Sequence, residues 1–331
     1  MSRLKLSCAL GNYAHTQDIQ TQKVQPEGIE LVNSELPIEA IAPRFATYLE
    51  FDVAEYSFGA YCAHLGSTKE PKMIALPVFT SRAFRHGNIY VNSGAGITSP
   101  KDLAGRRVGI PQWVQTAVIY VRGFLADDAG VALSDVSWVQ AGVDEPGRVD
   151  SGNFAIPDGV EIERRPDSTL GTMLLNGEID AIISARPPKA FLSGDPRMRR
   201  LYQDYKSAEE SYFQRSGVFP IMHVIAIRRA LYDQQRWVAR NLFNAFNLAK
   251  DAAVERMCST QVSHLPMAWT ADTFDKTNST LFGRDPWPYG VKKNRTTIEK
   301  FLKYSHEQGV TRRKVGIEEL FAPETELEIH V

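Results

Sequence analysis

Short apolar segments rich in β-branched and aromatic residues alternate with helix-like segments along this chain. Residues 4–9, 29–32, 52–56 and 73–78 have the composition of strands, and residues 37–47 have the spacing of a helix. A chain that alternates in this way buries its strands in sheets that helices cover. We therefore predict an α/β fold.

The alternation continues beyond residue 98. Ser99 has the character of an N-cap and Pro100 that of a first helical residue, and a predicted helix at 115–129 ends at Gly130. The further predicted elements are strands at 107–110, 136–140, 181–184 and 221–227, helices at 168–176 and 234–257, and a surface loop at 141–158.

The predicted elements at 93–220 form an αβ block between two other αβ segments. We predict two lobes, each a mixed sheet flanked by helices. Residues 1–92 with 221–331 form the first lobe, and residues 93–220 form the second, inserted lobe. The crossovers near 92–96 and 217–222 form a hinge, and a ligand is expected in the cleft between the lobes, at the C-terminal ends of strands.

The composition excludes several classes of partner. The 38 basic and 39 acidic residues are spread along 331 positions, without a basic patch typical of nucleic-acid or membrane-surface binding. No apolar stretch has the length of a membrane span, and the first ten residues lack the apolar core of a secretory leader. The widely spaced Cys8, Cys62 and Cys258 suit a reducing compartment. We expect a cytoplasmic protein without nucleic-acid or membrane partners.

A cationic segment, Ser-Arg-Ala-Phe-Arg-His-Gly at 81–87, follows one predicted strand and precedes an apolar run at 89–91. If this segment is extended, Arg82, Phe84 and His86 lie on one face and Arg85 on the other. Arg82 and His86 would then address the same pocket. Guanidinium groups and an imidazole are suited to a dicarboxylate that must receive a proton.

Eight segments together are similar to one family. They are residues 26–30, 51–57, 77–86, 102–111, 176–181, 185–188, 219–223 and 285–290. The stretches Ser-Arg-Ala-Phe-Arg-His and Phe-Pro-Ile-Met-His are the most particular, and on them the chain resembles the 4,5-dihydroxyphthalate decarboxylase family from about residue 4 to 323. One segment departs from the family pattern, because Tyr13-Ala14-His15-Thr16 stands where Tyr-Asp-Arg-Thr is expected.

The resemblance implies a fold like that of type II periplasmic solute-binding proteins in a cytoplasmic enzyme of phthalate catabolism. It implies loss of CO2 from 4,5-dihydroxyphthalate, an aromatic dicarboxylate, to give protocatechuate. It also implies a homo-oligomer. Protonation of the ring carbon that bears the leaving carboxylate requires no organic cofactor, but it requires a general acid and groups that stabilise the phenol as it loses its proton.

We predict His86 or His223 as the proton donor, because both end or flank predicted strands and histidine titrates near neutral pH. Glu55, at the end of a strand and close to Ser57, is predicted to accept a proton from a ring hydroxyl or to orient a histidine. The alternative for each of these groups is a hydrogen-bonded structural role.

The predicted substrate-binding residues include three arginines. A guanidinium paired with the departing carboxylate would stabilise the ground state and not the neutral CO2, so Arg82, Arg85 and Arg186 are assigned to the carboxylate that stays. Their alternative is a salt bridge at the surface or hinge. The other predicted substrate contacts are Tyr13 and His15 on the loop after the first strand, Ser57, and Trp113 and Thr116 at the start of a helix, with a core position as the alternative for Trp113.

Two broader alternatives remain open. No HxH or HExxH spacing is present, so we predict no metal, although a divalent ion held in space by His86, His223 and Glu55 is an alternative. A cytoplasmic solute-binding or sensor protein for a small aromatic or carboxylate ligand would have the same two lobes and arginines, and it would bind without catalysis.

Overall fold

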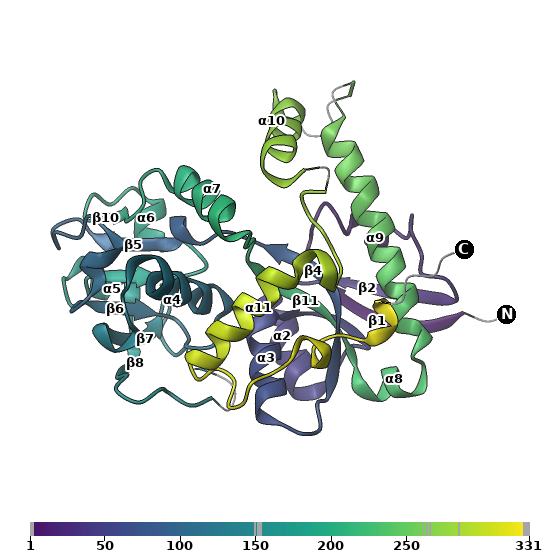
Figure 1. Cartoon of the computed structure of the whole chain (residues 1–331), viewed down its shortest axis with the longest axis horizontal. Coiled ribbons are helices and arrows are strands. Elements are labelled where there is room, and N and C mark those ends of the chain that lie inside the picture. Colours follow the sequence, from purple (N-terminus) through teal and green to yellow (C-terminus); the bar gives the residue numbers. More distant parts are fainter. Residues whose placement is uncertain are drawn as a thin grey trace.

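The computed structural model of this chain describes residues 3–148, 150, 154–259, 261–262, 264, 266–283 and 285–326. These residues form two lobes, each built around its own sheet, and Figure 1 shows the lobes side by side with both chain ends on the same lobe. The two mixed sheets with flanking helices are the α/β class that the sequence predicts, and this prediction is confirmed.

The first sheet has the strand order β2-β1-β3-β11-β4. β1 runs parallel to β2 and β3, whereas β11 is inserted antiparallel between β3 and β4. A strand from late in the chain is therefore in the interior of a sheet made by the first 82 residues. The strands are β1 (Leu4–Leu10), β2 (Ile29–Glu35), β3 (Val53–Ser57), β4 (Met73–Arg82) and β11 (Ile221–Arg228).

The second sheet has the order β10-β5-β9-β6-β7-β8. β6, β7, β8 and β9 are parallel, and β5 pairs antiparallel with β9 and with β10. The strands are β5 (Ile89–Asn92), β6 (Arg107–Ile110), β7 (Ser137–Gly142), β8 (Ile162–Thr169), β9 (Ala181–Ile183) and β10 (Met198–Arg200).

Helices connect the strands and cover the sheets. The α-helices are α1 (Gln17–Gln20), α2 (Ile38–Tyr48), α3 (Phe58–Ser67), α4 (Thr116–Ala129), α5 (Leu170–Leu175), α6 (Lys189–Leu192), α7 (Tyr205–Ser216), α8 (Arg229–Gln234), α9 (Trp237–Cys258), α10 (Thr270–Thr277) and α11 (Val291–Glu307). The short helical turns are η1 (His86–Asn88), η2 (Pro100–Leu103), η3 (Leu133–Asp135), η4 (Asn278–Phe282), η5 (Ile317–Glu319) and η6 (Pro323–Thr325). In Figure 1, α10 lies beside the outer end of α9, away from the two sheets.

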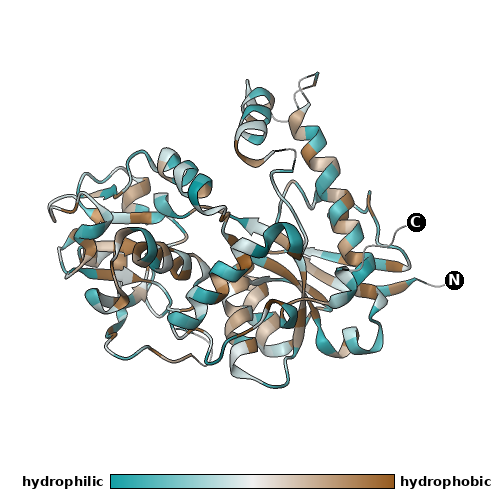
Figure 2. Ribbon diagram, in the orientation of Figure 1, coloured by the Kyte–Doolittle hydropathy of each residue, from teal (hydrophilic) through white to brown (hydrophobic). Residues whose placement is uncertain are grey.

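Apolar side chains fill the space between the sheets and their helices. Along β4 every residue but Ser81 is buried, and β11 is nearly as apolar. Figure 2 shows the hydrophobic colour on the central strands and on the helices against them, whereas α7 and α11 are largely hydrophilic. Cys8 and Cys62 are fully buried among these apolar residues and have no disulfide partner, and their burial raises the thiol pKa values. No helix among the described residues is long and apolar enough to cross a membrane.

One predicted lobe boundary and one predicted hinge differ from those in the structure. β5 was predicted to belong to the first lobe, but it pairs with β9 and β10 in the second sheet. The predicted hinge at 92–96 is wrong as well, because Ser93 N donates to Arg197 O at the edge of the second lobe. The chain crosses between the lobes at 83–88, after β4, and again at 217–220, where α7 leads into β11.

The segment around the end of α11 joins the two lobes. The Tyr304 hydroxyl and the amines of Lys300 and Lys303 bond to Asp127 on α4. Just after α11, Gln308 accepts from Arg122 Nε through its side chain and from Trp113 Nε1 through its carbonyl. These bonds hold the second lobe against a helix of the first.

Most of the predicted elements are present with small shifts at their ends, but several were not predicted. The predicted strand at 107–110 and the helix that ends at Gly130, which has φ 67°, agree with β6 and α4. The predicted helix at 168–176 begins later, because Ser168 and Thr169 belong to β8 and Thr169 caps α5. The elements without a prediction include the helices α1, α3, α6, α7, α8, α10 and α11 and the strands β8 and β10.

Candidate active site

Polar side chains gather where the strands of the first sheet end. Gly11 and Tyr13 follow β1, Glu55 lies near the end of β3, and His223 lies near the start of the antiparallel strand β11. In the ladder between β3 and β11, His223 lies opposite Ser57 and Ile225 lies opposite Glu55. The topology therefore brings three segments that are distant in the sequence together at one end of the strands.

Glu55 is the centre of this group. Its carboxylate has no exposed surface, and Oε1 lies 2.5 Å from His223 Nδ1 and accepts from the Tyr13 hydroxyl at 2.6 Å. Oε2 accepts from Gly11 N at 2.8 Å. The His223 side chain retains 19% of its surface. Because Nδ1 faces Glu55, Nε2 is the ring nitrogen left for a ligand.

The electrostatics favour an ionised Glu55 and a neutral Tyr13. Burial alone would raise the pKa of Glu55, but the bonds from His223, Tyr13 and Gly11 outweigh it and hold this pKa below its usual value. Burial, together with the charge of Glu55, raises the pKa of Tyr13. Glu55 therefore acts as an acceptor that fixes Nδ1 of His223 as the donor nitrogen, and Tyr13 stays a hydrogen-bond donor.

His15 lies behind Tyr13 in an aromatic group. Its ring centroid is 5.5 Å from Tyr13, 5.1 Å from Trp287 and 6.3 Å from Tyr289. Burial lowers the pKa of His15 to about 4, so the imidazole is neutral at pH 7. Its Nε2 is buried without a partner among the described residues. The predicted contact between His15 and a substrate stays a prediction.

A cavity of about 500 Å³ lies between the lobes. In the second lobe its walls come from the residues that follow β6, β7 and β9, and Glu39 of α2 contributes from the first lobe. This position, at the C-terminal ends of strands, is the one that the sequence predicts for a ligand cleft. The lining residues are Glu39, Pro111, Gln115, Gly142, Val143, Asp144, Glu145, Pro146, Gly147, Arg148, Ser184, Ala185, Arg186 and Lys189.

Ser57 and Thr116 connect this cavity to the Glu55–His223 pair. The Ser57 and Thr116 hydroxyl oxygens are 3.0 Å apart, and Thr116 Oγ1 also accepts from Gly59 N. Thr116 follows Gln115 of the cavity wall, and Ser57 lies opposite His223 in the sheet. The first turns of α3 and α4 thus meet next to Gln115 of the cavity wall.

Two of the predicted arginines flank the same part of the cavity wall. Arg186 is largely exposed and forms an ion pair of 2.6 Å with Glu39 across the cleft. Arg85 donates to Ala185 O at 3.2 Å, and its Nε lies 3.2 Å from Met222 Sδ, next to His223 in sequence. Burial lowers the pKa of Arg85 to about 10, so it remains charged at pH 7.

Arg82 and His86 do not share a pocket, contrary to the prediction. β4 ends at Arg82, and the chain then enters the turn η1 at His86, so the expected alternation of faces does not continue. Arg82 donates to the carbonyls of Phe219 and Pro288 and lines a different cavity. The His86 ring is stacked on Phe124 at 4.2 Å and is almost fully buried.

Trp113 belongs to the core and does not form the predicted stacking wall for a ligand. Its side chain is fully buried, and the Arg122 guanidinium lies 3.5 Å from its ring centroid. Trp138 packs against its edge. The protein itself therefore occupies the surfaces on which a substrate would stack.

The buried His86 gives stability a pH dependence. Burial lowers its pKa from 6.5 to about 4, so between these values the unfolded chain binds more protons than the folded one. Stability from this group is complete above pH 6.5 and falls as the pH drops towards 4, by about 2 kcal/mol at pH 5. His86→Phe should keep the stacking on Phe124. Between pH 7.5 and pH 5, its free energy of unfolding in urea should therefore fall by about 2 kcal/mol less than that of the unchanged protein. His264→Phe, at an exposed position, should show the same decrease in the free energy of unfolding as the unchanged protein. If His86→Phe also showed that full decrease, the pH dependence could not be assigned to His86.

Within the described part of the chain, no group of three or more His, Cys, Asp or Glu side chains is arranged to hold a metal ion. Glu55 and His223 lie together, whereas His86 packs against Phe124 and Tyr212 in the second lobe. The metal alternative that joined these three residues is thus not supported by their positions.

Two partners in the site were not predicted. Glu39, which pairs with Arg186, lies on a helix whose sequence shows no catalytic pattern, and the contact depends on how the lobes meet. The Gly11 amide, which donates to Glu55, is a backbone group. The signal for it in the sequence is a glycine two residues after the predicted strand at 4–9.

Comparison with solved structures identifies the class of fold, and comparison with known sequences identifies the family. The periplasmic aliphatic sulphonate binding protein SsuA from Escherichia coli has a similar structure, with a TM-score of 0.55 and 12% identity over 98% of this chain and 99% of that one. The fold is therefore that of two-lobed, type II periplasmic binding proteins. No family model matches the chain.

The sequence relatives are more specific. A 4,5-dihydroxyphthalate decarboxylase from Comamonas testosteroni is 35% identical over 98% of both chains. Another from Pseudomonas putida is 37% identical over 65% of this chain and 83% of the relative. The chain belongs to the 4,5-dihydroxyphthalate decarboxylase family, and the predicted family is confirmed.

Proposed function

We propose that this protein removes CO2 from 4,5-dihydroxyphthalate and yields protocatechuate. The observation that carries the proposal is the Glu55–His223 pair, with Tyr13 on the same carboxylate. The proposal is also supported by the family, because the two relatives described above are named 4,5-dihydroxyphthalate decarboxylases. Location in the cytoplasm, assembly as a homo-oligomer and the absence of an organic cofactor are parts of the proposal that follow from the family resemblance and the chemistry.

The reaction needs one proton delivered to carbon. His223 Nε2–H gives its proton to the ring carbon that bears the leaving carboxylate, while the hydroxyl para to that carbon loses its proton to solvent. The resulting cyclohexadienone carries hydrogen and carboxylate on the same carbon. When the bond to the carboxylate breaks, its electron pair restores the aromatic ring and CO2 departs. The phenolate then regains a proton, and His223 is reprotonated from solvent.

Glu55 and Tyr13 prepare His223 for this step. The ionised Glu55 accepts from Nδ1, which keeps Nε2 directed away from the carboxylate, and it stabilises the imidazolium that donates the proton. Tyr13 and the Gly11 amide occupy the remaining acceptor positions of Glu55, so the carboxylate is held in one orientation. Glu55 and Tyr13 are positioning residues in this proposal, and His223 is the catalytic acid.

The retained carboxylate is placed at Arg186, with Arg85 behind it. Arg186 now pairs with Glu39, and a substrate carboxylate would replace this partner. Both arginines flank Ala185, and Arg85 also reaches Met222, beside His223. A cation held away from the leaving group binds substrate and transition state equally, so it contributes to affinity more than to turnover.

Arg186→Met should therefore raise KM for 4,5-dihydroxyphthalate by roughly 10- to 100-fold and change kcat little, as expected for a lost charge-assisted contact. Steady-state kinetics of CO2 release measures both constants. Arg164→Met removes the same charge from an exposed position on β8 and should leave KM unchanged. A fall in kcat with an unchanged KM would place Arg186 at the reacting centre instead.

The function itself is tested by incubating the purified full chain with 4,5-dihydroxyphthalate and measuring CO2. The expected result is catalytic release of one CO2 and formation of one protocatechuate per substrate. Tight binding without CO2 release would support the alternative of a solute-binding or sensor protein. That result would overturn the enzymatic proposal.

A further inference from the structure

We propose a second binding site in this protein, separate from the interlobe cleft, which takes an aromatic carboxylate. The site is a cavity of about 460 Å³ between the end of β4, the end of α7 and the start of α11. Its lining residues are Arg82, Phe213, Gly217, Phe219, Phe282, Asp285, Pro288, Lys293, Asn294 and Thr297.

Arg82 supplies a buried cation without an acidic hydrogen-bond partner. Its residue surface is 7% exposed, and its described hydrogen bonds go to two backbone carbonyls, Phe219 O at 2.8 Å and Pro288 O at 3.3 Å. The Nε donor is buried and has no partner among the described residues. A buried guanidinium is costly unless an anion compensates it. The cavity that Arg82 lines leaves room for such an anion.

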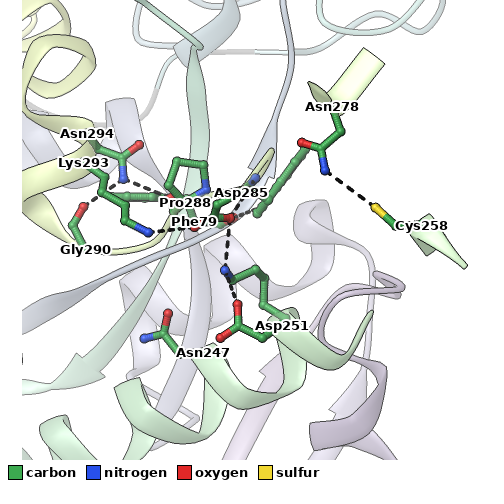
Figure 3. A network of polar contacts seen from close by, with 12 residues as sticks. Phe79, Asn247, Asp251, Cys258, Asn278, Asp285, Pro288, Gly290, Lys293 and Asn294 are labelled. Carbon is green, nitrogen blue, oxygen red and sulfur yellow. Dashed lines mark hydrogen bonds and ion pairs between the residues drawn. The ribbon is translucent and has the colours of Figure 1, made fainter. Parts of the chain in front are cut away.

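The surrounding charges leave an excess of one positive charge. Figure 3 shows Asp285 between two amines, and the distances are 3.1 Å to the buried Lys250 and 3.0 Å to Lys293. Lys250 also pairs with Asp251. Together with Arg82 this gives three cations and two carboxylates in the described cluster. A bound carboxylate would neutralise the excess.

The start of α11 adds a second attraction for an anion. Lys293 and Asn294 lie in the first turn of this helix of 17 residues, and Gly290 at its N-cap offers no side chain to the free amides. Figure 3 shows Asn294 directed toward the Pro288–Gly290 turn, where Asn294 Nδ2 donates to the carbonyls of Pro288 and Gly290, and it shows the Lys293 amine directed toward Asp285. Free amides at a helix start favour a negative charge.

Three phenylalanines form the apolar wall of the cavity and favour an aromatic ring. The ring centroids of Phe213 and Phe282 are 4.9 Å apart, and those of Phe219 and Phe282 are 5.2 Å apart. Aromatic rings pack at such separations in offset or tilted arrangements. A benzoate-like molecule would place its ring against this wall and its carboxylate toward Arg82 and Lys293.

The position of the cavity connects it to the lobe crossing. Phe219 lies in the segment that leads from α7 into β11, and Arg82 holds its carbonyl while Thr297 Oγ1 accepts from its amide at 3.3 Å. His223 follows Phe219 by four residues and lies on β11. A ligand that competes for the Arg82 donors would therefore weaken the bond to Phe219 O in the crossing at 217–220, and it would act on the relative position of the two lobes.

The test is isothermal titration of the full chain with benzoate. Wild-type protein should bind benzoate, and Arg186→Met, which alters the cleft, should retain this binding. Lys293→Met should weaken it roughly ten-fold, whereas Lys292→Met, an exposed neighbour on the same helix, should not. Arg82→Met and the space-filling Phe213→Trp should abolish it. Neutral benzamide should bind much more weakly than benzoate.

The proposal is overturned if wild-type protein does not bind benzoate, or if Arg186→Met abolishes all binding. It is also overturned if Lys293→Met and Phe213→Trp bind as wild type does. Lys293 is largely exposed, so its variant tests the site even if Arg82→Met fails to fold. The measurement follows binding and not CO2 release, so its outcome is independent of the proposed decarboxylation.

Discussion

Replacing His223 with glutamine is expected to lower kcat for CO2 release by roughly 10²- to 10⁴-fold, the range of general acid catalysis. Glutamine keeps a polar side chain next to Glu55 but cannot deliver a proton to carbon. KM should change much less than kcat, because the proposed carboxylate contacts are on Arg186 and Arg85. Steady-state kinetics, together with binding of protocatechuate to the variant, separates the two effects.

His264→Gln is the matched control, since it changes an exposed histidine outside the cleft. It should leave kcat and KM as they are. If His86→Phe lost CO2 release while His223→Gln retained it, the proton donor would be His86, and the assignment made from the Glu55 contact would be wrong.

Replacing Glu55 with glutamine is expected to lower kcat roughly 10²-fold or more. The neutral amide cannot stabilise the imidazolium, and its NH2 group would oppose one of the donors that now point at the carboxylate from Gly11, Tyr13 and His223. Leaving a buried donor without its acceptor should also cost about 1–3 kcal/mol of stability at pH 7. Kinetics and urea unfolding measure the two effects.

The pH dependence of the Glu55→Gln effect follows from the lowered pKa of this carboxyl. A carboxylate whose folded pKa lies below its unfolded value stabilises the protein above that unfolded value, near 4.5, and loses this contribution as the pH falls through the folded pKa. The stability difference between wild type and Glu55→Gln should shrink in that acidic range. Glu163→Gln, at an exposed carboxylate, should not lower kcat. A Glu55→Gln protein with full activity would contradict the role given to Glu55.

Much of the fold could be predicted because its central strands carry a clear local signal. β1, β3, β4 and β11 are apolar, and α4 has a glycine at its end in the left-handed region. The edge strand β8 has no such signal, since Ile-Glu-Arg-Arg-Pro-Asp-Ser-Thr is mostly polar and contains a proline that an edge position tolerates. α11 was missed because its buried positions include Asn294, Thr297 and Ser305 beside the apolar ones.

The site could be predicted in part. Tyr13 follows β1, Glu55 lies near the end of β3, and His223 lies near the start of the antiparallel strand β11, so the sheet topology brings the three to one end of the sheet. The grouping of Arg82 with His86 failed because it assumed that the strand continues, whereas it ends at Arg82. The Arg186–Glu39 pair joins two lobes, and no local pattern in the sequence specifies their relative placement.

The most direct test of the proposed mechanism is to run the reaction in D2O and locate deuterium in the product by mass spectrometry and NMR. Wild-type protein should release CO2 and give protocatechuate with one deuteron at the carbon that lost its carboxylate. The rate of this incorporation should fall with kcat in His223→Gln. Release of CO2 with no deuterium at that carbon, or an unchanged rate in His223→Gln, would contradict protonation of the ring by His223.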